Sequence, residues 1–224
     1  MPNNLCKYFN FLLIGVLLSC NKTEVKSILD HSIHHVLILG NSITYAPANP
    51  AVGWNGNWGM AASAADKDYV HLLTARFKEL NSLSTVDIKN IAEFEAYFDT
   101  YDFNQLQTLR DAKPDLIILR IGENVTRVQD AALFEKKYVE LLNYLKTNNT
   151  RVKILAVGSV WPLRTLANTV MKKYSDYITL ISLQSDKLNF AYGLFDNPGV
   201  ASHPSDKGMK YISDQIWAKV QRVL

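Results

Sequence analysis

Three polar residues that lie far apart in the sequence have the side chains that acyl transfer requires. Ser42 has a hydroxyl that can act as a nucleophile, His203 has an imidazole that can accept its proton, and Asn124 has an amide that can donate to an oxyanion. An unperturbed imidazole has a pKa of about 6.5, which suits a general base near neutral pH. These residue types predict serine-dependent acyl transfer, provided that the fold brings them to one cleft.

Ser42 follows a stretch that has the composition of a buried strand. Residues 36–39 are all apolar, as in a parallel strand that is covered on both faces. Gly40 allows a sharp exit, so we expect Ser42 at the carboxyl end of this strand, where open α/β sheets bind ligands. A helix that starts soon afterwards would add unpaired N–H groups that favour an anion. The alternative is that Ser42 or Thr44 only caps that helix.

The rest of the sequence alternates between strand-like and helix-like patterns. With right-handed crossovers, this order predicts one three-layer α/β/α sandwich around a central parallel sheet of about five strands. Asn124 would follow the third strand, and His203 would precede the last helix. The expected strands are residues 36–39, 86–91, 116–121, 152–160 and part of 188–195, and the expected helices are residues 60–80, the later half of 94–109, 131–146, 166–184 and 206–223.

The composition fits a single globular domain and excludes some classes of partner. The chain has 224 residues, of which 48% are hydrophobic, enough for one sizeable core. Its formal charge of +3 is small and no dense block of lysine and arginine occurs, so we expect no nucleic-acid partner. The sequence has no glycine-rich phosphate loop. We therefore expect no cofactor, and no pattern indicates a metal site or a protein partner.

Residues 1–19 have the features of an export signal rather than of a folded element. A positive charge precedes a short apolar run at residues 11–18, which is too short to span a bilayer and fits a signal-peptide core. The run ends in Leu17-Leu18-Ser19-Cys20, which resembles the lipobox of bacterial lipoproteins. Cleavage there would leave Cys20 lipidated, with residues 20–34 as a flexible tether to a domain at residues 35–224. We expect an exported lipoprotein anchored to a membrane of the bacterial cell envelope, and the alternative is an ordinary secretory signal.

Three short motifs make the chain resemble the SGNH/GDSL hydrolase superfamily. They contain Ser42, Asn124 and His203, and they occur in the order of that family, after the first, third and fifth expected strands. The resemblance spans residues 36–224 and implies a flavodoxin-like α/β fold. The absence of a Gly-x-Ser-x-Gly motif argues against the α/β-hydrolase fold. The motifs are Gly40-Asn41-Ser42-Ile43-Thr44, with Asn41 where many members have Asp, then Gly122-Glu123-Asn124, and His203-Pro204.

The resemblance implies a role for several residues of these motifs. Ser42 would be the nucleophile, and His203 would act as general base and then as general acid. Asn124 and the Ser42 backbone N–H would donate to the oxyanion, and losing one such donor typically costs about 2.7–4 kcal/mol of barrier lowering. The backbones of Gly122 and Ala92 are further candidate donors.

One departure from the family pattern concerns the group that orients the histidine. The last motif is usually Asp-x-x-His, but Val200 occupies the position of the Asp. Either Asp196 or Asp206 would then orient the ring of His203, or a backbone carbonyl would do so in a Ser–His dyad. An orienting carboxylate is worth roughly 10⁴ in rate where it has been removed from a triad, so its loss predicts a slow enzyme or an inactive site.

A second departure concerns the block after the second strand, which contains a glycine in the family. Residues 90–94 contain no glycine here. A backbone N–H of Ala92 or Glu93 would have to donate instead, and the sequence does not choose between them.

Aromatic residues at the expected strand tips are candidates for contact with a carbohydrate ligand. Trp54 and Trp58 lie in the loop after the Ser42 motif, and Trp161 ends the fourth strand. Their faces could stack on sugar rings, and the alternative is that they pack the loop. Glu123 would either contact the substrate or pair with Arg120.

These features and the resemblance together predict a serine esterase. Its expected substrate is a small-molecule or glycan ester, with an acetyl group on a carbohydrate as the expected case. One alternative is a surface glycan-binding protein that keeps the scaffold without turnover, and the missing Asp favours it. Another alternative is an acyltransferase that excludes water from the acyl-enzyme.

Overall fold

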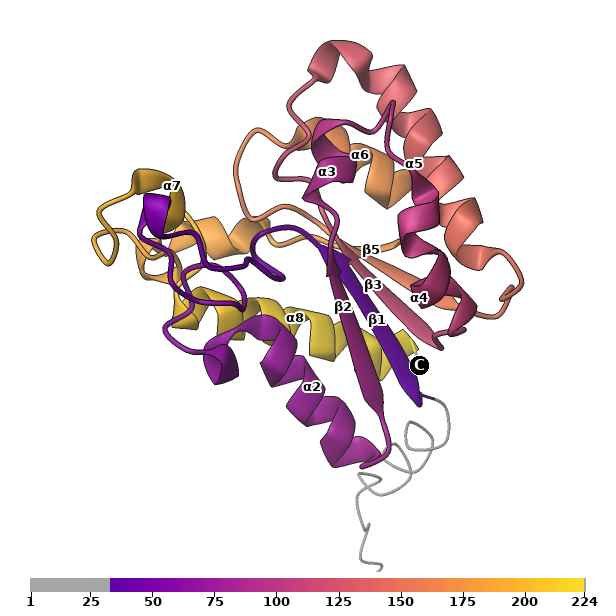
Figure 1. The fold of residues 1–224 in the computed structure, drawn as a ribbon, viewed down its shortest axis with the longest axis horizontal. Helices are drawn as coiled ribbons and strands as arrows, with labels where there is room; N and C mark the ends of the chain where they lie inside the picture. The colour runs from indigo at the N-terminus through magenta and orange to yellow at the C-terminus, as the bar shows by residue number, and fades with distance from the viewer. Residues whose placement is uncertain (1–32, 224) are drawn as a thin grey trace, which may run out of the picture.

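The structure, a computed structural model, describes residues 33–223 (Figure 1). Its centre is a five-stranded sheet in the order β2-β1-β3-β4-β5, and all neighbouring strands are parallel. The predicted parallel sheet is therefore confirmed. The strands are β1 (His35–Gly40), β2 (Thr85–Asn90), β3 (Leu116–Arg120), β4 (Lys153–Val157) and β5 (Asp176–Ile178).

Strand β1 occupies the middle of the sheet because its side chains are apolar on both faces. Val36 and Ile38 belong to the core on one side of the sheet, and Leu37 and Leu39 belong to the core on the other side. All four side chains are fully buried, and the strand pairs with both β2 and β3. This position brings the residues after Gly40 to the carboxyl edge of the sheet, beside the ends of β2 and β3.

Helices cover both faces of the sheet and complete the predicted three-layer sandwich. One face is covered by α2 (Tyr69–Leu80) and α8 (Asp206–Val223), which pack against each other (Figure 1). The short helix α7 (Pro198–Ala201) lies apart from these layers, in the segment before α8. The opposite face is covered by α3 (Ala92–Ala96), α4 (Gln107–Asp111), α5 (Ala131–Lys146) and α6 (Thr165–Tyr174).

The predicted bounds of α5 and α8 agree with the structure, but three other predicted helices are shorter. The helix expected from residue 60 begins only at Tyr69, because Asp68 caps it by accepting the N–H of His71. The helix expected in the later half of residues 94–109 is a 3₁₀ turn followed by the first part of the short helix α4. The start of this segment overlaps α3. The helix expected at residues 166–184 ends at Tyr174.

The fifth strand lies earlier in the chain than the sequence predicts. It comprises Asp176–Ile178 and pairs with β4, so the prediction of a strand within residues 188–195 is wrong. Tyr177 and Ile178 pack against the cores on opposite faces of the sheet, which is the alternation of a strand. A strand of this length is too short for its alternation to stand out in a sequence.

The predicted export signal at residues 1–19 and the predicted lipid attachment at Cys20 lie outside the described residues. Between residues 33 and 223, no helix is both long enough and apolar enough to cross a membrane.

Candidate active site

A tight turn after β1 presents Ser42 at the carboxyl edge of the sheet. The N–H of Thr44 donates to the carbonyl of Asn41 at 2.9 Å, which closes the turn. Gly40 is required before it, because a Cβ at that position would lie 1.9 Å from the Thr44 hydroxyl oxygen. That hydroxyl is hydrogen-bonded to the hydroxyl of Tyr69 at 2.6 Å instead of capping a helix.

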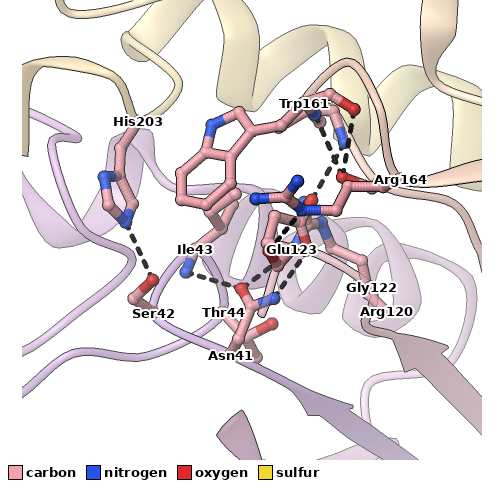
Figure 2. Close-up of polar contacts among 12 residues, drawn as sticks. Asn41, Ser42, Ile43, Thr44, Arg120, Gly122, Glu123, Trp161, Arg164 and His203 are labelled. Atoms are coloured by element: carbon pink, nitrogen blue, oxygen red, sulfur yellow. Dashed lines mark hydrogen bonds and ion pairs between the residues drawn. The ribbon is translucent and has the colours of Figure 1, made fainter. Parts of the chain in front are cut away.

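Ser42 and His203 are in direct contact, although they lie 161 positions apart in the sequence. Oγ of Ser42 lies 2.8 Å from Nε2 of His203 (Figure 2). His203 comes from the segment between α7 and α8. The structure therefore contains the predicted contact between a hydroxyl at the end of the first strand and an imidazole near the C-terminal helix.

A backbone carbonyl holds the other ring nitrogen of His203. Nδ1 lies 2.8 Å from the carbonyl oxygen of Gly199. Because a carbonyl oxygen can only accept, Nδ1 carries the proton in the neutral ring and Nε2 presents its lone pair to Ser42. This tautomer is the one that a general base beside Ser42 needs.

Helix α7 places the Gly199 carbonyl. Asn197 caps the helix by accepting the N–H groups of Gly199 and Val200. The side chain of Val200, which stands where the family has Asp, is 2% exposed and packs in an apolar cluster with Trp54. A backbone carbonyl from the same short helix thus takes the place of the usual carboxylate.

The two aspartates that the sequence suggests for orienting His203 have other surroundings in the structure. Asp206 accepts hydrogen bonds from the N–H and the hydroxyl of Ser63, at 2.8 and 2.6 Å. Asp196 lines a surface cavity. The prediction that Asp196 or Asp206 orients His203 is therefore wrong, because Gly199 already occupies Nδ1.

His203 is largely enclosed, and this burial affects its protonation. The residue is 6% exposed. Burial is the main cause that lowers the pKa of His203 below 6.5, while the Gly199 carbonyl acts in the opposite direction by favouring the imidazolium. The indole of Trp161 packs edge-to-face on the imidazole with ring centroids 5.5 Å apart (Figure 2). Its N–H donates to the carbonyl of Ser202. Trp161 therefore helps to desolvate the ring and to hold its position.

We expect the imidazole of His203 to titrate with a midpoint below pH 6.5, because burial lowers its pKa. Only the neutral ring can take the proton of Ser42, so a lowered pKa extends the pH range in which His203 can act as a base. The ring-proton signals of His203 in nuclear magnetic resonance spectra, identified by their loss in His203→Asn, would measure this midpoint between about pH 4 and pH 8. Unfolding at each pH should be monitored in parallel as a control. A midpoint at or above 6.5 would contradict the prediction.

A buried ion pair lies beside the Ser42 turn. Nη2 of Arg120, at the end of β3, donates to Oε1 of Glu123 at 2.6 Å, and both side chains are almost completely buried. Asn41 bridges them, because its Oδ1 accepts from Arg120 and its Nδ2 donates to Oε2 of Glu123 (Figure 2). Burial raises the pKa of Glu123, but Arg120 and the hydrogen-bond donors outweigh it, so this pKa lies below its usual value. Of the two roles expected for Glu123, the ion pair is present, and the predicted substrate contact is wrong because the side chain is enclosed.

Glu95 in α3 is a second buried carboxylate at this site, and the sequence motifs do not identify it. The side chain is fully buried. Its Oε2 accepts from Nδ2 of Asn124 at 2.6 Å, its Oε1 accepts from the N–H of Gly122, and Nδ2 of Asn41 lies 3.2 Å from both oxygens. Burial and the neighbouring Glu123 raise the pKa of Glu95 to about 7, against the effect of these donors.

One signal in the sequence could have identified Glu95. It lies four residues after Ile91 and three before Phe98, both of which are buried. A glutamate at this helical spacing falls on an apolar face, and glutamates are rarely buried without polar partners.

The backbone N–H of Ser42 and the side chain of Asn124 are the candidate oxyanion donors that the structure leaves available. The backbone N–H of Ser42 has no hydrogen-bond partner among residues 33–223, and one N–H of the Asn124 amide is bound to Glu95, which leaves the second one. The N–H of Gly122 donates to Glu95, and that of Ala92 donates to the side chain two residues before it. The predictions of Gly122 and Ala92 as donors are therefore wrong, because both N–H groups are already bound.

The three tryptophans differ in their exposure. Trp54 is 3% exposed and packs edge-to-face against Trp58 and Phe195, so the prediction that it stacks on sugar is wrong and the alternative of loop packing is correct. Trp58 is half-buried, and its N–H donates to a backbone carbonyl in the same loop. Trp161 remains partly exposed next to His203.

Comparison with solved structures places this fold among the SGNH/GDSL hydrolases. A two-domain esterase active on acetylated mannans matches 89% of this chain with 15% identity and a TM-score of 0.53. A family two carbohydrate esterase from Cellvibrio japonicus matches 84% with 17% identity and a TM-score of 0.51. A protein from Bacteroides ovatus described as a GDSL-like lipase matches 86% of this chain, over its own full length, with 15% identity and a TM-score of 0.53.

These similarities concern the fold, because the identities are low. The chain spans 53% of the length of the mannan esterase and 61% of the Cellvibrio enzyme. No protein-family model matches the chain, and no curated protein matches it. The predicted SGNH/GDSL fold is confirmed, and the solved structures that share it include proteins described as esterases and lipases.

Proposed function

We propose that this protein is a serine esterase that hydrolyses an acetyl ester on a carbohydrate, with Ser42 as nucleophile and His203 as general base. The observation that carries the proposal is the series of hydrogen bonds from Gly199 through His203 to Ser42, which are both 2.8 Å long. This series sets the tautomer of the ring and directs its free nitrogen at the hydroxyl.

In the proposed reaction, Nε2 of His203 takes the hydroxyl proton while Oγ of Ser42 bonds to the ester carbon. The Ser42 N–H and the free N–H of Asn124 donate to the carbonyl oxygen as it becomes an oxyanion. The imidazolium then protonates the leaving sugar oxygen as the ester C–O bond breaks. Water, deprotonated by the same ring, attacks the acyl-enzyme, releases acetate and restores Ser42.

The Gly199 carbonyl supports this reaction less strongly than a carboxylate would. It is neutral and stabilises the imidazolium only through its dipole, so some acceleration is lost. Removing the carboxylate of a triad costs roughly 10⁴ in kcat where the replacement amide forces the wrong tautomer. A carbonyl cannot donate and so cannot force that tautomer, and we therefore expect a smaller loss here.

A carbohydrate is the proposed alcohol part of the substrate for two reasons. Solved structures with this fold include esterases active on acetylated mannans and family two carbohydrate esterases. Trp161 presents a partly exposed indole beside His203, where a sugar ring leaving Ser42 would pass. Export and anchoring through Cys20 would place the enzyme at envelope or extracellular glycans, and both belong to the proposal.

Covalent labelling tests the proposed function. We expect a fluorophosphonate to modify Ser42, identified by peptide mass spectrometry, and acetate to be released from an acetylated glycan. No labelling together with glycan binding would favour a binding protein without turnover. Acetyl transfer to an added sugar in preference to water would favour an acyltransferase.

Replacing Trp161 by alanine tests the carbohydrate part of the proposal. We expect KM for an acetylated oligosaccharide to rise about fivefold, since a ring contact of this kind is worth about 1 kcal/mol, and KM for p-nitrophenyl acetate to change much less. The Trp161→Phe variant keeps an aromatic face and serves as the control, with a smaller rise. An equal rise for both substrates would remove the support for a sugar contact at this position.

A further inference from the structure

The carboxylate of Glu95 touches the ends of two strands that carry the proposed site. Its Oε1 accepts the backbone N–H of Gly122, and its Oε2 accepts Nδ2 of Asn124 at 2.6 Å. Nδ2 of Asn41, the residue before Ser42, lies 3.2 Å from both oxygens. One buried side chain from α3 therefore connects the motif that contains the nucleophile with the motif that contains the oxyanion donor.

We propose that Glu95 is a positioning residue that holds the amide of Asn124 with its nitrogen toward the oxyanion site. This inference rests on the proposed function, because it assumes that Asn124 donates to an oxyanion.

The argument depends on what each group can do in a hydrogen bond. An ionised carboxylate only accepts, whereas an asparagine amide donates from one end and accepts at the other. With Glu95 on one side, the Asn124 amide therefore has a single favourable orientation, and its second N–H stays free. The opposite orientation would set its carbonyl oxygen against a carboxylate oxygen and point a lone pair at the developing oxyanion.

The charged groups around Glu95 leave its carboxylate free to accept hydrogen bonds from Asn124 and Gly122. The facing groups are Glu123 and Arg120 from the end of β3, and the neutral Asn41 from the turn after β1. Arg120 is paired with Glu123, so Glu95 has no cation of its own within the described network. Burial and Glu123 raise the pKa of Glu95 to about 7, so the group is ionised in mildly alkaline solution and is the member of the cluster that takes a proton first.

The Glu95→Gln variant tests the proposal without changing the size of the side chain. Gln has one oxygen and one NH₂ group, so it sets N–H against N–H at one of the two positions. Because the Gly122 backbone cannot reorient and the Asn124 amide can, we expect Asn124 to flip and to present its oxygen to the oxyanion site. The expected result is a fall in kcat of about 10²-fold on p-nitrophenyl acetate at pH 8, with KM changed less than about twofold.

A matched control and a double variant distinguish the positioning of Asn124 from an unspecific effect of the substitution on the folded protein. Glu79→Gln makes the same chemical change at an exposed position on α2, and kcat should stay within about twofold of wild type. If Glu95 acts through Asn124, then adding Glu95→Gln to Asn124→Ala should cause no further loss. A kcat of Glu95→Gln within about twofold of wild type, or losses that multiply in the double variant, would overturn the proposal.

Nuclear magnetic resonance of the wild-type protein gives a measurement that needs neither turnover nor a folded Glu95 variant. The side-chain amide signals of Asn124, identified by their loss in Asn124→Ala, should shift in a single titration as Glu95 ionises. Signals that do not move between about pH 5 and pH 9 would contradict the contact. Absence of esterase activity and of Ser42 labelling in wild type would instead refute the proposed function, so the two failures can be told apart.

Discussion

The Ser42→Ala variant is expected to lose at least about 10³-fold in kcat on acetyl esters. The hydroxyl of Ser42 is the group to which His203 directs its free nitrogen at 2.8 Å, and no other serine hydroxyl contacts this ring in the described chain. Without it, the acyl-enzyme cannot form, and only the oxyanion donors remain to assist attack by water. Initial rates on p-nitrophenyl acetate and on an acetylated oligosaccharide would measure the loss.

The matched control is Ser182→Ala, which removes an exposed hydroxyl far along the chain. Its kcat should equal that of wild type within about twofold. The Ser42→Ala protein should unfold at nearly the same temperature as wild type, because its side chain is partly exposed and its Oγ contacts only His203. Equal turnover by Ser42→Ala and wild type would refute the nucleophile assignment and the proposed reaction with it.

The Arg120→Met variant is expected to lower the free energy of unfolding by about 3–5 kcal/mol at neutral pH. Arg120 is completely buried, and it is the cation that compensates Glu123 beneath the proposed site. Methionine fills much of the same volume but leaves Glu123 and Glu95 close together without a positive charge. Urea unfolding at pH 7 and at lower pH would measure the effect.

The pH dependence of this difference has a definite sign. Arg120 lowers the pKa of Glu123, so the pair contributes stability above the unfolded pKa of glutamate, and this contribution is lost as the pH falls through the lower folded pKa. The deficit of Arg120→Met should therefore be largest near neutral pH and shrink on acidification. The control is Arg76→Met, which breaks a partly exposed pair with Asp214 and should cost about 1 kcal/mol or less. A deficit for Arg120→Met no larger than that of the control would contradict the prediction.

Much of the fold could be predicted because its signals are local and repeated. The apolar run at residues 36–39 and the long amphipathic patterns of α5 and α8 have the periods of buried strands and surface helices. The strand β5 could not be found in this way, because Asp176–Ile178 is too short to show a period and is recognised only by its pairing with β4.

The proximity of Ser42 and His203 could be predicted for a topological reason. Parallel strands bring their carboxyl ends to one edge of the sheet, so residues that follow different strands meet there regardless of their separation in the sequence. The orienting group could not be predicted in the same way, because the Gly199 carbonyl belongs to the backbone and every residue has one. Only the turn of α7 shows that this carbonyl, rather than Asp196 or Asp206, reaches Nδ1 of His203.

The sequence by itself therefore determined the layers of the sandwich and the side chains that meet at its edge. The spacing of the apolar residues and the alternation of strands and helices can both be read directly from the residue types. The tertiary structure alone decided which polar groups are already bound and which remain free. Glu95 occupies the N–H of Gly122 and one N–H of Asn124, and Trp54 is packed away from solvent. Whether such a hydrogen bond forms depends on differences of a few tenths of an ångström in the distance between segments far apart in the chain. The type of a single residue does not determine that distance.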